Sequence, residues 1–236
     1  GNISQATQVV TLVDTTLPDI FAPSDIVAEA TSLSGTMIEL GEATANDIMG
    51  IASITEHPSR FFVLGETTIT WTATDTSGNT ASATQTVTIV DTTSPSITAP
   101  ASITMEATSA DSNIVTLGNP VSNDLVDIPS ISNNSPAVFP LGETIVTWTA
   151  VDVSGNTVSA TQTVTIIDTT SPELTIPEDI IISAFSLEKQ VEIGEAQADD
   201  LAGSILTITN DAPNTFPLGD TIVTWNVSDE FGNSVS

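Results

Sequence analysis

The sequence repeats itself with a period of 77 residues. Gly78-Asn79, Gly155-Asn156 and Gly232-Asn233 are spaced by this interval, and Gly1-Asn2 stands one interval earlier. Solenoid repeats are usually about 20–50 residues long and cannot fold singly, whereas a longer repeat can build a small core of its own. The period therefore predicts a separate strand at 1–14 followed by three small domains, at 15–91, 92–168 and 169–236.

The clearest predicted strand occurs once in each repeat, at Glu66–Asp75, Glu143–Asp152 and Asp220–Asp229. In the first copy Ile69, Trp71 and Ala73 alternate with threonines, which is the period-two pattern of a half-buried strand. A short turn containing Gly-Asn and a second Thr-rich strand follow, and this order indicates a β-hairpin. Because no helical periodicity of useful length is present, the sequence predicts an all-β protein.

Three motifs recur in the repeats: a Val-Asp-Thr-Thr-Ser-Pro linker, a Pro-Leu-Gly-x-Thr-x-Val-x-Trp run and an Asp-x-Ser-Gly-Asn turn. In this combination the chain resembles the hyalin repeat (HYR) family, although the third turn departs mildly at Asp229–Asn233. The resemblance implies three tandem immunoglobulin-like Greek-key sandwiches used in extracellular adhesion, stalks or surface layers. It implies no catalytic residues, and we expect that the chain is not an enzyme.

The charge of the chain limits the classes of partner that it can bind. The formal net charge is −28, since 30 acidic residues face only Lys189 and Arg60. Nucleic acids and anionic membranes would be repelled by this charge, and we expect neither as a partner. No stretch of 18 apolar residues is present, so no membrane-spanning helix is expected. We expect an extracellular or cell-surface protein of microbial origin.

The N-terminal segment Ala6–Val13 copies the strand Ala83–Val90, whereas the third repeat reaches Ser236 where its own copy would begin. A strand without its neighbour recruits another strand, as in donor-strand complementation. We predict that Ala6, Gln8, Val10 and Leu12 of one chain complete the third repeat of another. The predicted acceptor residues are Ile222, Val223, Trp225 and Val227. Because the contact is head-to-tail, it predicts an open filament made of copies of this chain.

Other interpretations remain open. The sequence is also consistent with a window from a covalently continuous adhesin stalk of many repeats, or with an N-terminal segment that stays unpaired or folds on its own chain. A third class is a secreted polysaccharide-acting enzyme that uses such repeats as accessory domains, and it requires a catalytic region outside these 236 residues.

Strand direction is expected to bring aspartates together at one pole of each repeat. Clusters of oxygen ligands suit Ca²⁺, so Ca²⁺ is the one candidate cofactor, and Glu29 and Glu106 are expected to approach the following linkers. The simpler alternative is that these aspartates cap turns and solubilise the surface. The candidate calcium ligands are Asp14, Asp47 and Asp75; Asp91, Asp124 and Asp152; and Asp168, Asp200 and Asp229.

The remaining chemistry is sparse. His57 is the only histidine and cysteine is absent, so a transition-metal site is not expected. Trp71, Trp148 and Trp225 occupy one repeated position and are predicted to be core residues rather than ligand platforms. Three sequons permit N-glycosylation, at Asn2, Asn133 and Asn226.

Overall fold

The computed structural model describes residues 1, 3–56, 60–203 and 205–236, so the His57 position and the Asn2 sequon lie outside the described residues. The chain forms two compact units. One contains Gly1–Ser96, Asn123–Ser130 and Val151–Thr157, and the other contains Ile97–Ser122, Ile131–Ala150 and Val158–Ser236. Among the described residues, no helix is long and apolar enough to cross a membrane.

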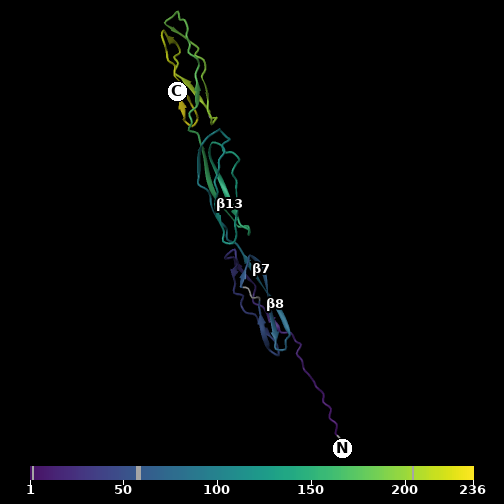
Figure 1. Cartoon of the computed structure of the whole chain (residues 1–236). Helices are drawn as coiled ribbons and strands as arrows, with labels where there is room; N and C mark the ends of the chain where they lie inside the picture. Colours follow the sequence, from purple (N-terminus) through teal and green to yellow (C-terminus); the bar gives the residue numbers. More distant parts are fainter. Residues whose placement is uncertain (2, 57–59, 204) are drawn as a thin grey trace. The chain divides into compact units, whose positions relative to one another are not determined.

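The first repeat (15–91) is built around one long hairpin. Strand β7 (Gly65–Asp75) pairs antiparallel with β8 (Thr80–Val90), and the two are seen together in Figure 1. They lie in a four-stranded sheet of order β2-β8-β7-β5, while β1 pairs with β4 and β3 with β6. The shorter strands are β1 (Asp19–Phe21), β2 (Ile26–Glu29), β3 (Thr36–Met37), β4 (Thr44–Asn46), β5 (Ile51–Thr55) and β6 (Phe61–Phe62).

The second repeat (92–168) has the same plan. Its sheet has the order β10-β14-β13-β12, in which β10 and β14 are parallel, and β9 pairs with β11. The strands are β9 (Ser96–Thr98), β10 (Ile103–Glu106), β11 (Val121–Asn123), β12 (Ser130–Asn133), β13 (Gly142–Val151) and β14 (Thr157–Ile167).

The third repeat (169–236) is less regular. Its strands form two pairs, β15-β17 and β16-β19, and a three-stranded sheet of order β18-β20-β21. Strand β20 has only 4 residues, whereas its counterpart β7 has 11 and β13 has 10. The strands are β15 (Glu173–Thr175), β16 (Glu188–Lys189), β17 (Gln197–Asp199), β18 (Thr207–Asn210), β19 (Phe216–Pro217), β20 (Trp225–Ser228) and β21 (Ser234–Val235).

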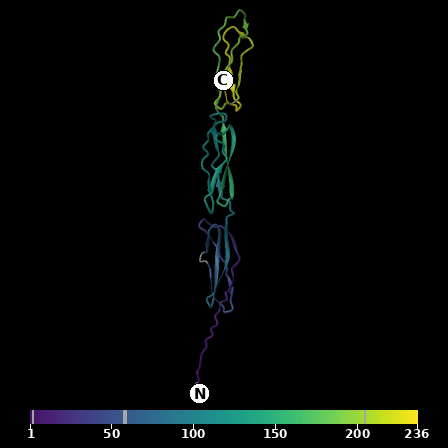
Figure 2. The same cartoon turned by 90° about the vertical axis from the view of Figure 1, so that its right-hand side faces the viewer.

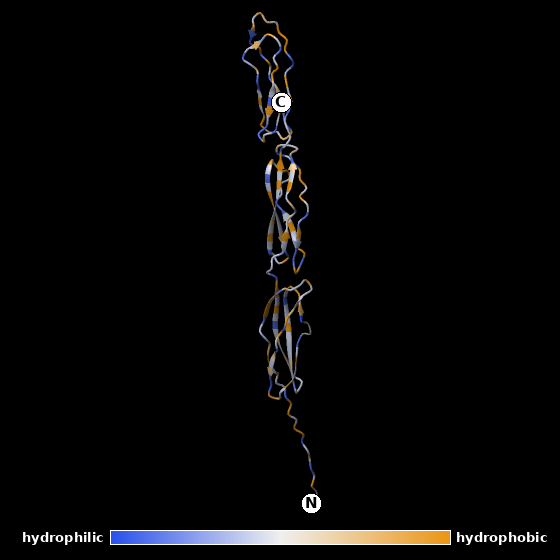
Figure 3. Ribbon diagram, turned by 90° about the vertical axis from the view of Figure 1, so that its left-hand side faces the viewer, coloured by the Kyte–Doolittle hydropathy of each residue, from blue (hydrophilic) through white to orange (hydrophobic). Residues whose placement is uncertain are grey.

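The cores follow from the alternation read in the sequence. Ile69, Trp71 and Ala73 are 0%, 4% and 0% exposed, and their counterparts Val146, Trp148 and Ala150 are equally buried. Figure 3 shows orange, hydrophobic residues interspersed with white and blue residues along the strands. The hairpin turn needs glycine, because Gly78 has φ of 95°, a region that side-chain-bearing residues rarely adopt. The predicted fold class, an all-β protein of immunoglobulin-like sandwiches, is confirmed.

Candidate assembly groove and acidic poles

The third repeat contains a groove of about 840 Å³, which we call the open groove. It is lined by three segments of the third repeat: Ile176–Ile182 with Ala184; Lys189, Val191 and Ile193; and Phe216–Val223 with Trp225. In the first repeat this position is filled by β8, which lies between β2 and β7, and in the second by β14 between β10 and β13. The third repeat supplies only the two residues of β21 at this position.

Both neighbours of that position are altered in the third repeat. Residues 180–183 correspond to β2 and residues 219–224 to the first half of β7, yet neither segment is assigned as strand. Ile181 is 98% exposed and Ile222 is 89% exposed. Trp225 is only partly buried, whereas Trp71 and Trp148 are 4% and 6% exposed. Without a strand between them, the two segments lack the ladder of backbone hydrogen bonds that β8 gives to β2 and β7 in the first repeat.

The four predicted acceptor residues therefore do not all face the core. Val223, Trp225 and Val227 are on the side of the core, and Val227 is 1% exposed. Ile222 alternates with them and is turned to solvent, as is its counterpart Ile145, which is 58% exposed.

The N-terminal segment is the unpaired counterpart of the groove. Residues 3–13 form no strand, and Figures 1 and 2 show this segment in purple extending away from the first repeat. Val10 and Leu12 are 74% and 91% exposed, whereas the residues one period later, Val87 and Ile89, are 0% and 2% exposed. The segment therefore presents the apolar residues of a core strand to solvent.

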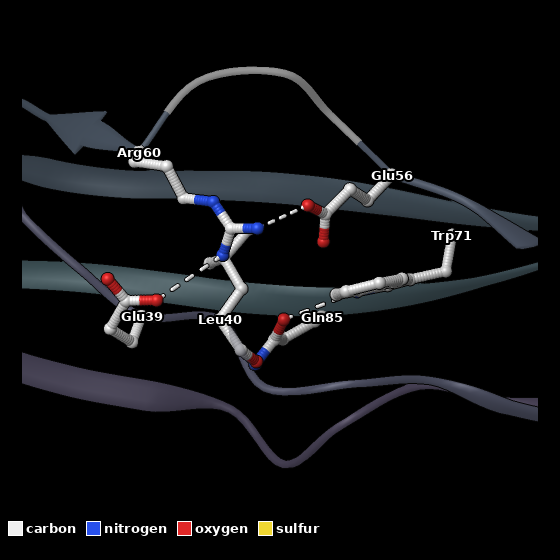
Figure 4. Close-up of polar contacts among 6 residues, drawn as sticks. All are labelled: Glu39, Leu40, Glu56, Arg60, Trp71 and Gln85. Carbon is white, nitrogen blue, oxygen red and sulfur yellow. Dashed lines mark hydrogen bonds and ion pairs between the residues drawn. The ribbon is translucent and has the colours of Figure 1, made fainter.

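In the first and second repeats, a buried glutamine of the β8-type strand forms a hydrogen bond with the tryptophan of the same repeat. Trp71 Nε1 donates to Gln85 Oε1 at 3.2 Å, and Gln85 Nε2 donates to the carbonyl oxygens of Ser24 at 2.7 Å and Leu40 at 3.0 Å. Figure 4 shows this contact beside the ion pairs of Arg60. Sequence reasoning did not assign this role. The signal was a glutamine on the apolar side of an alternating strand.

The second repeat repeats the contact. Trp148 Nε1 donates to Gln162 Oε1 at 3.1 Å, and Gln162 Nε2 donates to the carbonyl oxygens of Ala101 at 2.8 Å and Leu117 at 2.9 Å. Gln85 and Gln162 are 0% and 1% exposed. Each glutamine side chain binds three polar groups at once, so the contact fixes the strand along its own axis.

Two of the three predicted acidic clusters are brought together. Asp14, Asp47 and Asp75 place carboxylate oxygens within 4.8 Å of one another, and so do Asp168, Asp200 and Asp229. Among the described residues, Asp91, Asp124 and Asp152 form no such group. At this middle pole Asp124 Oδ1 accepts the backbone N–H groups of Val126 and Asp127.

The hairpin turn builds each pole. Asn233 Nδ2 donates to Asp229 Oδ2 at 2.8 Å and to the backbone carbonyl of Asp168 at 3.2 Å. Asn79 and Asn156 bind the linker carbonyls of Asp14 and Asp91 in the same way. These hydrogen bonds explain why Gly-Asn recurs with the period. In each repeat the asparagine amide binds the linker that precedes that repeat, and this linker carries the first aspartate of the pole.

Asp168 has one buried carboxylate oxygen without a hydrogen-bond partner. Its side chain is 8% exposed, its Oδ1 accepts the Thr170 N–H at 3.1 Å, and its buried Oδ2 has no hydrogen-bond partner in the structure. Burial raises the pKa of Asp168, and the Asp200 and Asp229 carboxylates raise it further, against the Thr170 hydrogen bond that lowers it. Such a carboxylate is best satisfied by a cation.

The linkers are held from the preceding repeat, as expected. Glu29 accepts hydrogen bonds from the Thr92 N–H at 2.7 Å and the Thr93 hydroxyl at 3.1 Å, and Glu106 binds Thr169 and Thr170 likewise. The Thr92 N–H in particular lowers the pKa of Glu29, although partial desolvation opposes it. The third repeat has Ser183 at this position.

A loop contact that the sequence did not reveal also joins repeats. Val126 belongs to the buried cluster that contains Trp71, and Ala202 to the cluster that contains Trp148. They are 5% and 1% exposed, whereas Met49, at the same loop position of the first repeat, is 58% exposed. Val126 and Ala202 therefore each pack against the repeat that precedes their own.

The remaining candidate residues lie at the surface. Asn133 in β12 and Asn226 in β20 are both exposed, so neither sequon is buried.

The tandem sandwiches, with linkers bound at their poles, define a multi-repeat β-sandwich protein of the immunoglobulin-like class. The HYR domain model matches residues 13–89 and 90–166, and the chain therefore belongs to the HYR domain family.

Several curated proteins are similar. The chain is 34% identical over its whole length to "Hyalin" of Strongylocentrotus purpuratus and 33% identical over 99% of its length to "Hyalin" of Lytechinus variegatus. It spans 22% and 48% of these relatives. It is also 33% identical, over 66% of its length, to the "Sushi, von Willebrand factor type A, EGF and pentraxin domain-containing protein 1" of Rattus norvegicus, of which it spans 5%. These are animal proteins, so the expected microbial origin gains no support.

Solved structures with related folds include mouse Cadherin-23 EC22-24, with a TM-score of 0.38, 13% identity and coverage of 92% of this chain and 94% of that one. Sidekick-1 immunoglobulin domains 1–5 give a TM-score of 0.36 at 15% identity, covering 67% of this chain and 40% of that one. Likeness at this level carries no argument about function.

Proposed function

We propose that the chain is a non-catalytic structural module of an extracellular HYR-repeat assembly, in which residues 5–14 of one copy fill the open groove of the next. This proposal is carried by the match between an unpaired copy of the β8 sequence and a groove at the position that β8 and β14 fill in the first two repeats. The assembly is a head-to-tail filament of copies of this chain, and the HYR family and the hyalin relatives support an adhesion-type role.

The energetics favour such a junction. Burying Val10 and Leu12 as Val87 and Ile89 are buried contributes roughly 1.5–3 kcal/mol each before losses in entropy. Backbone hydrogen bonds to residues 219–224 and 180–183 add about 1 kcal/mol each. The junction therefore gives the third repeat the strand that β8 and β14 provide in the first and second repeats.

Negative-stain microscopy and sedimentation velocity of the full chain test this proposal. Wild type is expected to form threads, and the double variant Val10→Asp/Leu12→Asp is expected to remain as single chains, because charged side chains would enter a core. The matched control Thr7→Asp changes a residue whose counterpart Thr84 is exposed, and it should leave threads intact. Threads from the double variant, or only single chains from wild type, would overturn strand donation.

A second candidate is a segment of a covalently continuous stalk, and the greater length of the hyalin relatives favours it. The same strand chemistry applies there, but a peptide bond joins the donor to the repeat that it completes. Mass spectrometry of the native protein separates the two: a subunit near 24.4 kDa supports donation between chains, and a much larger polypeptide supports the stalk. N-glycans at the exposed Asn133 and Asn226 would be read in the same spectra.

We also propose that Ca²⁺ binds the acidic pole formed by Asp168, Asp200 and Asp229. The unpartnered, buried Oδ2 of Asp168 supports this site, since a carboxylate in that position gains most from a cation. The equivalent oxygen of Asp14 is also buried and unpartnered, in the group with Asp47 and Asp75. Extracellular calcium modules bind with dissociation constants of roughly 10⁻⁴–10⁻³ M.

Thermal unfolding of the full chain with and without millimolar Ca²⁺ tests the pole. Wild type should gain melting temperature in Ca²⁺, and Asp168→Asn should lose most of the gain assigned to the third repeat. Glu195→Gln, an exposed acidic residue of the same repeat, is the matched control. Equal responses of wild type and Asp168→Asn would exclude this site.

A further inference from the structure

We infer that Gln8 is the residue that sets the register of the donated strand, by binding the indole of Trp225 inside the open groove. This inference rests on the strand donation proposed above and specifies which contact selects the partner. Gln8 stands one period before Gln85 and two before Gln162, and Trp225 stands one period after Trp148.

The two complete repeats give the geometry. In each, a tryptophan indole donates to the glutamine oxygen, and the glutamine nitrogen donates to two backbone carbonyls that belong to other parts of the same sandwich. Figure 4 shows Gln85 between Trp71 and the Leu40 main chain. Within the described part of the chain, the Trp225 indole nitrogen has no hydrogen-bond partner.

The two carbonyls that Gln8 would bind can be located. Ser24 and Ala101 are one period apart, and the next position is Glu178. In the stretch that follows, the third repeat is one residue shorter, and a glycine shows the alignment. Gly41, Gly118 and Gly194 have φ of 82°, 81° and 79°. Each of them lies against the proline that precedes the carbonyl-bearing residue, which is Pro23, Pro100 or Pro177. The counterpart of Leu40 and Leu117 is therefore Ile193.

These positions converge in one place. Glu178, Ile193 and Trp225 all line the open groove, although they come from three separate segments of the third repeat. A strand placed there in the register of β8 on β7 sets Gln8 opposite Val223 and Ala6 opposite Trp225, as Gln85 is opposite Ile69 and Ala83 opposite Trp71. The side chain of Gln8 then has the three partners that Gln85 has.

This contact adds specificity that apolar burial alone does not supply. A strand displaced by two residues would still bury valine and leucine, but it would leave the Trp225 N–H and the Glu178 and Ile193 carbonyls without the glutamine partner that their counterparts have. It would also bury the amide of Gln8 unpaired. Strands with an apolar residue in place of the glutamine are rejected for the same reason.

Peptide binding to the full chain tests the inference. The acceptor is the full chain carrying Val10→Asp/Leu12→Asp, whose changes lie on the exposed N-terminal segment, and the probe is a synthetic peptide of residues 3–14. The Gln8→Ala peptide should bind about 10- to 100-fold more weakly than wild type. The Gln5→Ala peptide is the matched control, because its counterpart Ser82 is exposed, and it should bind as wild type does.

The indole N–H signals of the three tryptophans in ¹⁵N-labelled acceptor give the second readout. The wild-type peptide should shift and protect the Trp225 signal, and the Gln8→Ala peptide should not protect it. Failure of the wild-type peptide to bind would refute strand donation itself. Equal affinity and equal protection with both peptides would refute the role of Gln8 while leaving donation intact, and equal weakening by Gln5→Ala would refute register selection.

Discussion

At the scale of single residues, buried polar side chains link strands and loops through hydrogen bonds. Gln85 joins β8 to the Trp71 indole and to two loop carbonyls, and it is fully buried. Asn113, also 0% exposed, binds the Phe139 carbonyl at 3.0 Å and receives the Thr108 N–H at 2.7 Å. In a small sandwich without disulfides, such satisfied groups define one arrangement of otherwise similar apolar strands.

We expect Gln85→Leu to destabilise the first repeat by about 1–3 kcal/mol, because it leaves the Trp71 N–H and the Ser24 and Leu40 carbonyls unpaired. Chemical denaturation of the full chain measures the change. The double variant Trp71→Phe/Gln85→Leu should lose less than the sum of the two single changes. Strict additivity would show that the indole and the amide do not act together.

At the scale of elements, the Asp-x-x-Gly-Asn turn determines how each hairpin meets its linker. Asp152 Oδ1 accepts the Asn156 N–H at 2.7 Å and its Oδ2 accepts the Asn156 side chain at 2.9 Å. Burial of Asp152 raises its pKa, but the Asn156 hydrogen bonds outweigh this and hold the pKa below its ordinary value of 3.8. The turn is therefore built for the ionised carboxylate.

This shift has a defined pH dependence. Because the folded-state pKa lies below the unfolded one, the stabilisation by Asp152 is complete above about pH 4 and is lost as the pH falls through the folded-state value. In metal-free buffer, the free energy of unfolding of wild type should exceed that of Asp152→Asn at pH 7, and the difference should shrink towards pH 2. Asp19→Asn, at an exposed position, is the control. A difference that is independent of pH would contradict this account of the turn.

At the scale of the molecule, the first and second repeats are each joined to the following repeat at two places: a glutamate binds the next linker, and a loop residue of the next repeat packs into the core. In the first repeat the exposed Met49 occupies the loop position of Val126 and Ala202. Met49 is therefore the surface expected to contact the third repeat of the chain that receives the donor strand.

Accordingly, Met49→Asp should weaken association of the full chain about tenfold, since a charge would replace a buried side chain. Sedimentation equilibrium gives the association constant. Ile48→Asp is the matched control, because Ile48 and its counterparts Leu125 and Leu201 are 88%, 60% and 66% exposed. An equal effect of both substitutions on the association constant would show that Met49 does not form this contact.

Much of this organisation could be predicted from the sequence. The alternation at Ile69, Trp71 and Ala73 and the Gly-Asn turn predicted the hairpin, because both patterns are local. The approach of Glu29 and Glu106 to the linkers followed from strand direction. The side-chain contacts of Gln85 and the insertion of Val126 into a neighbouring core could not be predicted, because they depend on the three-dimensional course of loops. For the same reason the middle acidic cluster was expected but did not form.

The central claim is tested most directly by disulfide trapping, since the chain has no cysteine of its own. In the register of Thr70 opposite Thr84, Thr7 of the donor lies opposite Thr224 of the acceptor. Oxidation of the double variant Thr7→Cys/Thr224→Cys should give a ladder of cross-linked multiples on a non-reducing gel. The pair Thr7→Cys/Ser228→Cys, four residues out of register, should give none. A cross-link confined to single chains, equal ladders from both pairs, or no ladder from the first would contradict strand donation between molecules.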